Sequence, residues 1–413
     1  MSEAQPKAGP LAGVVVLDLS RVLAGPWATQ VLADLGAEVI KIERPGSGDD
    51  TRAWGPPFAG GADGSRSDAA YFLAANRNKK SVTVDIGVPD GAALVRALAA
   101  KADVVVENFK VGGLKKYGLD YGSLRAANPR LVYCSITGFG QTGPYAGRAG
   151  YDYMIQAMGG LMSVTGQPEG APGGEPMKVG VAVADLFAGM YASSGILAAL
   201  LHARATGQGQ QVDIALFDVQ AAMLANQAAN YFATGVAPAR LGNAHPNLAP
   251  YQPFATADGA LVIAVGNDGQ FRALAAALGA PDLGADPRFL TNALRIEHRA
   301  ALTEALGALT SGRTTADWIA VLEAAGVPCG PINTIDQVFA EPQAQARGLV
   351  VEQTRDDLAG PVRTPASPIR LSQTPVAYRA APPALGADTL ELLADRLGLL
   401  EAELEALRRR GVI

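Results

Sequence analysis

The stretch that decides the fold is residues 14–43, VVVLDLSRVLAGPWATQVLADLGAEVIKIE. Its first four residues are apolar and mostly β-branched, which is typical of a short buried strand. Pro26 suits the first turn of a helix, and Gly36 ends the segment of helical periodicity that follows. A second apolar strand, 37–43, comes directly after. The stretch therefore predicts a β-α-β unit, in which a helix joins two parallel strands.

The same alternation of strand and helix continues through the first third of the chain. Short strands are predicted at 81–86, 103–107 and 131–136, with helical segments at 91–100 and 114–118 between them. Strands that alternate with helices favour an α/β fold built on a mostly parallel sheet. In such sheets, ligands bind near the carboxyl ends of the strands.

The C-terminal half has a different texture. Residues 241–253 are rich in Gly, Asn and Pro, and the sequence Ala-Asp-Gly at 257–259, between two apolar runs, is typical of a hairpin turn. Three helical segments follow, at about 268–278, 297–309 and 315–325. We therefore expect a separate α+β domain here. Residues 353–388 carry many Pro and little periodicity, which predicts a linker.

Composition excludes several classes of function. With 34 Lys and Arg against 39 Asp and Glu, the formal net charge of −5 argues against a nucleic-acid partner. Two Cys and three His are too few for a disulfide framework or a Cys-rich zinc site, so we expect no metal. Because His is scarce, an enzyme built from this chain depends on carboxylates, hydroxyls or a bound cofactor.

Neither membrane insertion nor export is predicted. Residues 1–10 lack the apolar segment of a signal peptide and the Arg-rich pattern of a transit peptide. The longest charge-free apolar run, 186–201, contains Tyr191 and two Ser, and it is too short and too polar for a membrane span. We expect a buried core helix there, and a soluble, cytoplasmic protein that binds no membrane.

Candidate nucleotide-binding features gather around the first β-α-β unit. A helix that begins near Pro26 presents free backbone N–H groups to an anion. Arg21, Arg44 and Lys79 lie near strand starts and ends, where they would hold a phosphorylated nucleotide. A solvated basic loop explains them equally well. The segment GFGQTG at 138–143 matches GxGxxG, but no helical pattern follows it, so it favours a flexible loop.

Asp185 has two interpretations. It stands at the head of the apolar run 186–201, where Asp is favoured as a helix N-cap. It is also a candidate carboxylate nucleophile beside small residues, at a helix start whose N–H groups would stabilise an oxyanion. The spacing alone favours the cap, and the two roles are partly compatible.

Ordered motifs along nearly the whole chain carry a resemblance to a known family. They are LDLSRVLAGP (17–26), VIKIERP (39–45), NRNKKS (76–81), VENF (106–109), CSITGFGQTGP (134–144), GYD (150–152), VAD (183–185), TGQGQ (206–210), GVPCGPIN (326–333) and GVI (411–413). In this order they resemble the class III CoA-transferases, the CaiB/BaiF family. The segment DDTRAWGPPF (49–58) is most similar to the succinate–hydroxymethylglutarate branch, which handles dicarboxylates.

The resemblance implies that Asp185 is the nucleophile of a CoA transfer. In the family, the matching Asp attacks an acyl-CoA thioester, and the reaction passes through a mixed anhydride and an aspartyl-CoA thioester. No tightly bound cofactor is implied, because coenzyme A arrives as a thioester substrate. The implied partners are an acyl-CoA donor, such as succinyl-CoA, and a carboxylic acid acceptor, here a dicarboxylic one.

The resemblance also implies the binding residues. The CoA-binding positions that match the family are Arg21, Val22, Leu23, Arg44, Lys79, Asn108, Phe109 and Lys116. Some members have His and Gln where this chain has Arg21 and Leu23, and Arg where it has Lys116. Arg52 is our candidate for the acceptor's distal carboxylate because it lies in the branch-specific segment, with a surface loop Arg as the alternative. His245 is our candidate for a substrate contact from its Gly/Asn/Pro-rich loop.

For the fold, the resemblance implies a Rossmann-like large domain with a smaller α+β domain, in a homodimer whose subunits thread as interlocked rings. We expect the N-terminal part of the large, CoA-binding domain at 1–205 and a linker at 206–250. The small domain is expected at 251–330, a returning linker at 331–388, and a C-terminal helix of the large domain at 389–413.

Three other functions stay open on the residues alone. An α-methylacyl-CoA racemase resembles the family but carries Gly-His-Asp where this chain has Gly-Tyr-Asp at 150–152, so its acid/base pair is incomplete here. An NADP-dependent oxidoreductase would use the β-α-β unit together with Arg44. A non-catalytic CoA-binding protein would hold acyl-CoA without turnover.

Overall fold

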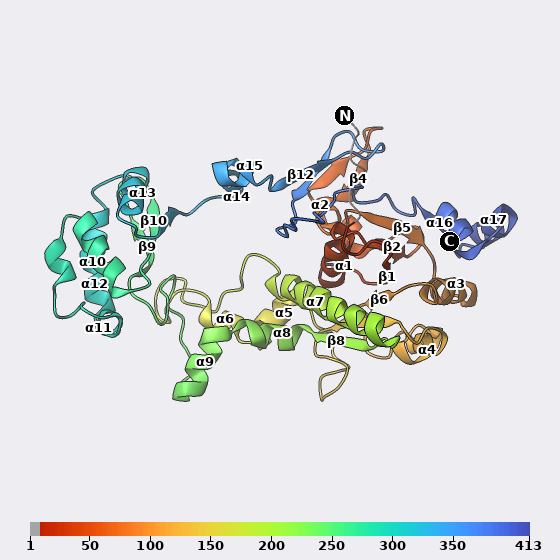
Figure 1. The fold of residues 1–413 in the computed structure, drawn as a ribbon, viewed down its shortest axis with the longest axis horizontal. Helices are drawn as coiled ribbons and strands as arrows, with labels where there is room; N and C mark the ends of the chain where they lie inside the picture. Colours follow the sequence, from red (N-terminus) through yellow and green to blue (C-terminus); the bar gives the residue numbers. More distant parts are fainter. Residues whose placement is uncertain (1–8) are drawn as a thin grey trace. The chain divides into compact units, whose positions relative to one another are not determined.

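The chain forms two compact units, in a computed structural model that describes residues 9–413. Of the described residues, the first unit comprises 9–159, Gly180–Met223 and Pro342–Ile413, and the second comprises Gly160–Val179 and Leu224–Glu341 (Figure 1). Both ends of the chain therefore contribute to the first unit. The expectation about a targeting segment rests mainly on residues 1–8, which lie outside the described residues.

A six-stranded parallel sheet organises the first unit. Its strands are β1 (Val15–Asp18), β2 (Glu38–Glu43), β5 (Lys79–Thr83), β6 (Val104–Glu107), β7 (Val132–Thr137) and β8 (Gln211–Ala215). Their order across the sheet is β5-β2-β1-β6-β7-β8, and every pairing is parallel. This confirms the predicted α/β fold. The order reverses between β1 and β6, so the loops after these two strands diverge and leave a crevice at their carboxyl ends.

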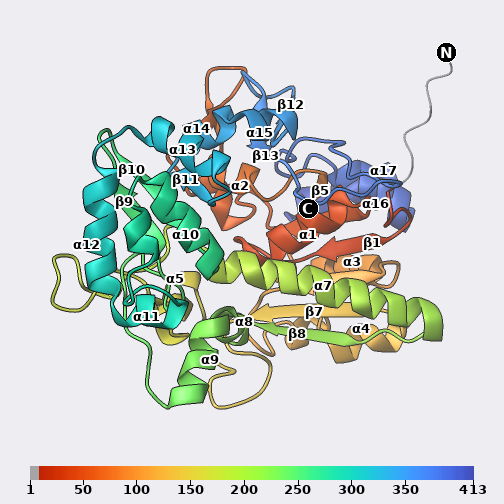
Figure 2. The same ribbon diagram turned by 60° about the vertical axis from the view of Figure 1, so that its left-hand side comes forward.

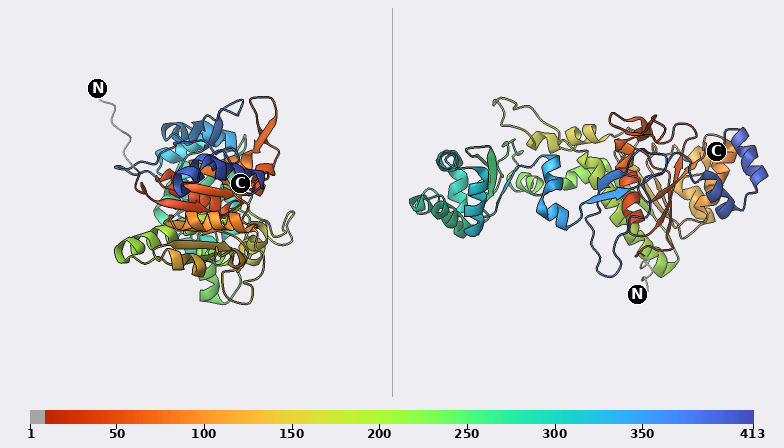
Figure 3. Two further views of the ribbon diagram at one scale, coloured as in Figure 1. Left: turned by 90° about the vertical axis from the view of Figure 1, so that its right-hand side faces the viewer. Right: turned by 90° about the horizontal axis from the view of Figure 1, so that it is seen from above.

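Side chains of the strands alternate between two cores, one on each face of the sheet. Val16 and Val106 belong to the first core, and Leu17 and Val105 belong to the second. Helices α1 (Ala24–Asp34) and α7 (Val183–Thr206) cover the first face (Figure 2). The second face is covered by α3 (Pro89–Ala99), α4 (Tyr121–Ala127), α16 (Thr389–Leu397) and α17 (Glu401–Arg409). In Figure 3 the blue C-terminal helices lie next to orange segments of this unit, and α16 contacts α3 and β5.

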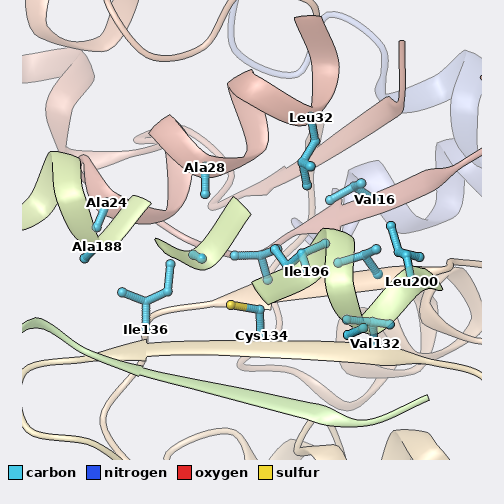
Figure 4. Packing of buried hydrophobic residues seen from close by; sticks show 14 of the residues in the cluster. Val16, Ala24, Ala28, Leu32, Val132, Cys134, Ile136, Ala188, Ile196 and Leu200 are labelled. Atoms are coloured by element: carbon cyan, nitrogen blue, oxygen red, sulfur yellow. The ribbon is translucent and has the colours of Figure 1, made fainter. Parts of the chain in front are cut away.

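Helices α1 and α7 approach closely because small residues line their contact (Figure 4). Ala24 of α1 lies beside Ala188 and Gly189 of α7. A Cβ on Gly189 would stand 2.7 Å from the Ala24 carbonyl oxygen, so only glycine permits this separation. One turn further along, the Ser193 hydroxyl donates to the Ala28 carbonyl at 3.3 Å.

The apolar run 186–201 lies within α7 and packs into the core on one side. Ala192 and Ile196 are fully buried, as expected of a core helix, whereas Phe187, Tyr191 and Leu201 are 46%, 49% and 69% exposed. Among the described helices, α7 alone is long and apolar enough to cross a membrane, a property that core helices of soluble proteins share.

The second unit has its own core. Strands β9 (Tyr251–Ala255), β10 (Ala260–Ala264) and β11 (Cys329–Pro331) form an antiparallel sheet in the order β11-β10-β9. The predicted hairpin turn at 257–259 is confirmed between β9 and β10. Phe271, Leu306 and Trp318 fill the core from the surrounding helices. The helices of this unit are α6 (Leu161–Val164), α9 (Ala225–Thr234), α10 (Asp268–Ala277), α11 (Asn292–Glu297), α12 (Arg299–Thr310), α13 (Thr315–Ala324) and α14 (Ile335–Ala340).

The two expected linkers contain regular structure, and in the first of them the sequence pattern itself predicts a strand at 211–216 and a helix at 216–235. Within 206–250, β8 joins the main sheet because it pairs with β7, and α8 (Leu216–Met223) follows it. Within 331–388, β12 (Val350–Gln353) pairs with β13 (Val362–Pro365) after α15 (Pro342–Ala346). The first unit also contains β3 (Phe58–Gly60), β4 (Arg66–Ala69), α2 (Ala70–Leu73), α5 (Asp152–Met158) and the 3-10 helices η1 (Asp50–Ala53) and η2 (Lys115–Tyr117).

Truncation of a buried side chain in the first core should destabilise the protein strongly. Leu32 of α1 is fully buried, so Leu32→Ala removes apolar contacts and leaves a cavity. We expect it to lower the free energy of unfolding by about 2–5 kcal/mol, measured by urea denaturation. Leu400→Ala, at a side chain that is 70% exposed, is the matched control and should change stability by less than about 0.5 kcal/mol. Equal effects from the two variants would contradict the described packing.

Candidate active site

A cavity of about 660 Å³ opens in the first unit at the carboxyl ends of β1 and β6. Its wall includes the turn after β1, which leads into α1, and the loop after β6. Segments that follow β7 and the start of α7 complete it. The cavity therefore occupies the place where the reversal of strand order leaves a crevice. The cavity-lining residues that we predicted as functional are Arg21, Val22, Leu23, Arg44, Asn108, Phe109, Lys116 and Asp185.

The two loops at the crevice are tied together by Asn108. Its side-chain carbonyl accepts from the Arg21 backbone N–H at 2.9 Å, and its amide donates to the Arg21 backbone carbonyl at 2.6 Å. The Arg21 guanidinium also stands 5.5 Å from the centre of the Phe109 ring. Asn108 therefore fixes the separation of the loops, and Phe109 supplies an apolar surface beside a cation.

Glu107, the last residue of β6, holds the loop that follows this strand. It is buried, and its carboxylate accepts from the Phe109 backbone N–H at 2.8 Å. Burial raises the pKa of Glu107 to about 7, with a further contribution from the negative charge of Asp213, while hydrogen bonds from Ser135 and Phe109 oppose the rise. The sequence motif contains Glu107, but its pattern alone did not identify it as a support of the cavity wall.

Asp185 lies in the first turn of α7, at the third helical position, and it lines the cavity. It is not the N-cap, so the interpretation that the spacing favoured is wrong. The capping carboxylate is Asp152, whose Oδ1 accepts from the backbone N–H groups of Ala184 at 2.8 Å and Asp185 at 3.4 Å. Asp152 does the capping from α5, 33 residues earlier, which leaves the Asp185 side chain free of that task.

The electrostatics of Asp185 follow from this arrangement. Burial raises the pKa of its carboxyl to about 7, and the negative charge of Asp152 adds to the shift. The neighbouring Tyr71 hydroxyl has its pKa raised to about 12 by burial and by the charges of Asp185, Asp152 and Asp49. A carboxylate with a raised pKa is more basic, and therefore more nucleophilic when ionised, than an ordinary aspartate.

Two glycines shape the wall next to Asp152. Gly138, which follows β7, and Gly150, which precedes α5, both line the cavity. A Cβ on Gly138 would stand 2.5 Å from the Gly150 Cα, so the two backbones touch. Gly138 is the first residue of the GxGxxG segment. The expected loop follows this segment, since the next helix begins only at Asp152. The role of Gly138 in this cavity is the close approach of two segments.

Cations surround the cavity mouth. Arg44 and Lys116 line the cavity, and Arg148, which was not among the predicted residues, lines it as well. The Arg148 guanidinium stands 4.6 Å from the centre of the Tyr145 ring, and among the described residues it forms no ion pair. Its position three residues before Tyr151, in a Gly-rich loop after a strand, was the available signal.

Lys79 and Arg52 lie outside this cavity, because buried carboxylates hold them. The Lys79 ammonium is fully buried and donates to Asp18 at 3.1 Å; desolvation lowers its pKa to about 8. The Arg52 guanidinium lies 2.6 Å from Glu43 and 2.9 Å from Asp68. These contacts give both cations a part in the fold, and their predicted ligand roles stay predictions.

His245 belongs to the second unit. Its Nδ1 accepts from the Asn247 backbone N–H at 3.0 Å, and its ring centre lies 5.1 Å from that of Tyr251. It does not line the cavity of the first unit. A role in substrate binding stays a prediction. Among the described residues, no group of three or more His, Cys, Asp or Glu side chains is arranged to hold a metal ion.

Comparison with known proteins gives consistent matches over most of the chain. The model of a family described as CoA-transferase family III matches residues 11–389. A succinate–glutarate CoA-transferase of Agrobacterium fabrum is 56% identical over 358 residues, covering 86% of this chain and 88% of that protein. A succinyl-CoA:glutarate CoA-transferase of Homo sapiens is 47% identical over 343 residues, covering 83% of this chain and 76% of that one.

Solved structures agree with these matches. A CaiB/BaiF family protein from Brucella suis superposes with a TM-score of 0.83 at 52% identity. The match covers 94% of this chain and all of that one. A protein from Mycobacterium tuberculosis superposes with a TM-score of 0.80 at 33% identity, and covers 93% of this chain and 99% of that chain.

The pKa of Asp185 predicts a pH dependence. A reaction that needs its ionised carboxylate should lose rate as the pH falls through about 7, so we expect the acid limb of kcat/KM to lie there. Asp152→Asn keeps a capping oxygen but removes the like charge, so it should lower the pKa of Asp185 and move the acid limb to lower pH. Asp90→Asn, at an exposed carboxylate of α3, should leave the profile unchanged. An acid limb that stays in place in Asp152→Asn would contradict the electrostatic contribution of Asp152.

Proposed function

Because this chain belongs to CoA-transferase family III, we propose that it moves CoA from succinyl-CoA to a dicarboxylic acid. The observation that carries the proposal is one cavity that holds Asp185 together with most of the predicted CoA-binding residues. The names of two close relatives pair succinate or succinyl-CoA with glutarate, so glutarate is the first acceptor to test. A racemase is less well supported, because the position of its catalytic His holds Tyr151.

CoA is proposed to bind along the loops after β1, β2 and β6. Arg44 and Lys116 would contact its phosphates, since cations at the cavity mouth have the charge and reach for that task. A smaller cavity of about 160 Å³ adjoins through Arg44 and Phe109, and its wall includes the apolar Val84 and Ile86. An apolar pocket beside Arg44 suits the adenine ring and the neighbouring 3′-phosphate.

Asp185 is the proposed nucleophile. Its carboxylate attacks the donor thioester carbonyl, and the C–S bond breaks to give a mixed anhydride and CoA thiolate. The thiolate attacks the Asp185 carbonyl, which releases the donor acid and leaves an aspartyl-CoA thioester. The acceptor carboxylate attacks that thioester and expels the thiolate, which then takes the acceptor's acyl group and regenerates Asp185. No proton or electron is gained or lost overall, so no tightly bound cofactor is required.

Backbone groups near the cavity suit the charge that develops in these steps. The first turn of α7 places the positive end of its dipole beside Asp185. Leu23 and Ala24, at the start of α1, also line the cavity. Oriented N–H groups of this kind stabilise a tetrahedral oxyanion. Water must be kept out during the reaction, because an anhydride hydrolyses readily.

The working protein is proposed to be a cytoplasmic homodimer of interlocked subunits with a Rossmann-like large domain. The exposed apolar residues Phe187, Tyr191 and Leu201 on α7 support association, since burying them in a second copy is favourable. The strand order of the sheet, 3-2-1-4-5-6 when counted along the chain, supports the comparison with nucleotide-binding domains.

Trapping the covalent intermediate tests the mechanism. We expect incubation with succinyl-CoA followed by hydroxylamine to convert Asp185 alone to a hydroxamate, detected by peptide mass spectrometry. Asp185→Asn should lose transfer activity by about 10³-fold or more, because the amide is not a nucleophile. Asp90→Asn is the control for a carboxylate outside the cavity. Active wild-type protein without modification at Asp185 would overturn the mechanism.

Two variants that each remove one positive charge test the proposed CoA site. Arg44→Ala should raise the KM for succinyl-CoA about tenfold with little change in kcat, because the phosphate contact is made equally in the bound and transition states. Lys80→Ala removes a cation that pairs with Glu38 and does not line the cavity, so its KM should match that of the wild type. A larger effect at Lys80 than at Arg44 would refute this assignment.

A further inference from the structure

The turn between β1 and α1 has a strained backbone. Val22 adopts φ +73°, the left-handed region, where a β-branched residue is a genuine outlier. Such conformations cost about 1–3 kcal/mol and persist only where surrounding structure enforces them. They cluster at functional sites, and Val22 lines the cavity that holds Asp185. The question is which side chains enforce this conformation.

Three residues hold consecutive peptide groups of this turn. Lys41 donates to the Ser20 backbone carbonyl at 2.8 Å, and Asn108 bonds both backbone groups of Arg21. Asp49 accepts from the Val22 backbone N–H with both carboxylate oxygens, at 3.2 and 3.3 Å. The strained residue is thus anchored through its own N–H group and through the residue before it.

Lys41 and Asp49 act as one unit. The Lys41 ammonium lies 2.9 Å from an Asp49 oxygen, and both side chains are fully buried. Asp49 also accepts from the Thr51 backbone N–H and hydroxyl, at 3.0 and 2.8 Å. Although burial alone would raise it, the pKa of Asp49 is lowered to about 2, chiefly by Lys41, so its charge persists at neutral pH. The pair offers a rigid, permanently charged acceptor at the Val22 N–H.

The backbone conformation of Val22 sets the direction of the next residues of the chain. Leu23 and Ala24 follow Val22 directly, line the same cavity and begin α1. Among the described residues, no acceptor is recorded for their backbone N–H groups. A reversal of the backbone at Val22 would turn these peptide groups away from their present orientation.

We propose that the buried Lys41–Asp49 pair is a positioning device that holds Val22 in its left-handed conformation and thereby sets the Leu23–Ala24 wall of the cavity. Neither side chain lines the cavity that holds Asp185, although both line the smaller cavity beside Arg44. Recovery of activity by a change at Val22 therefore separates an action through the turn from a direct contact with CoA. The inference rests on the proposed role of the Asp185 cavity in CoA transfer. Misplacing a cavity wall by about an ångström costs on the order of 10²-fold in rate.

A rescue experiment tests the proposal. Lys41→Met together with Asp49→Leu replaces the ion pair by apolar side chains, an exchange that often preserves stability. We expect kcat/KM for transfer from succinyl-CoA to glutarate to fall about 10- to 100-fold, and the Kd for CoA to rise about tenfold. Adding Val22→Gly should restore at least tenfold of the loss in kcat/KM, because glycine adopts positive φ without enforcement. Val22→Gly alone completes the cycle.

A second buried ion pair provides the control. Arg77→Met together with Asp34→Leu removes a pair on the C-terminal end of α1, outside the cavity, and should leave kcat/KM within about twofold. Melting temperatures of all variants separate lost stability from lost positioning. If the Lys41/Asp49 double variant does not fold, Asp49→Asn with and without Val22→Gly repeats the comparison.

The outcomes are distinct. Full activity in a folded pair variant, or a loss that Val22→Gly does not recover, would overturn the positioning role. If wild-type protein binds CoA but transfers none, while the pair variant loses CoA affinity and added Val22→Gly restores it, the proposed function is overturned and this inference stands.

Discussion

The first turn of α1 touches α7 at Gly189, where a side chain of any size would collide with the Ala24 carbonyl oxygen. That contact lies one helical turn after Asp185, and Ala24 itself lines the cavity together with Val22 and Leu23. Two helices far apart in the sequence are therefore locked together next to the proposed nucleophile. Because small residues form the interface, the separation of the two helices has little freedom to vary. The site between their first turns is therefore held rigidly.

The charged side chains of the first unit fall into two groups, which are buried ion pairs within the fold and cations that line the cavity. The net charge of −5 conceals buried cations and carboxylates that hold the segments around β1 and β2 in place. Lys79 and Arg52 are occupied in this way, and Arg44 and Lys116 remain at the cavity mouth. The desolvation of buried pairs such as these offsets much of their Coulombic attraction, so a buried pair is weak evidence for added stability. Proximity in the sequence to a functional motif therefore does not separate binding cations from structural ones.

Much of the fold could be predicted from local pattern. The alternation of strands and helices that begins at residues 14–43 predicts the parallel sheet. The Ala-Asp-Gly turn predicts the hairpin of the second unit. The pairing of β8 with β7 could not be predicted, because strand neighbours depend on long-range packing. The same limit applies at the site. Asp185 has the sequence context of an N-cap, and only the tertiary approach of Asp152 shows that another carboxylate performs that task.

The raised pKa of Asp185 has a chemical consequence for the proposed exchange. In the mixed anhydride, the CoA thiolate can attack either carbonyl. Attack on the Asp185 carbonyl expels the donor acid, whose carboxyl has an ordinary pKa of about 4. Attack on the donor carbonyl expels Asp185, whose pKa is about 7. The less basic carboxylate is the better leaving group, so the buried environment favours the aspartyl-CoA thioester over return to the starting thioester. The same effect opposes the last step, in which Asp185 must leave the acceptor anhydride. Burial thus makes Asp185 a stronger nucleophile when ionised and a poorer leaving group once acylated, and it costs a fraction of ionised enzyme at neutral pH.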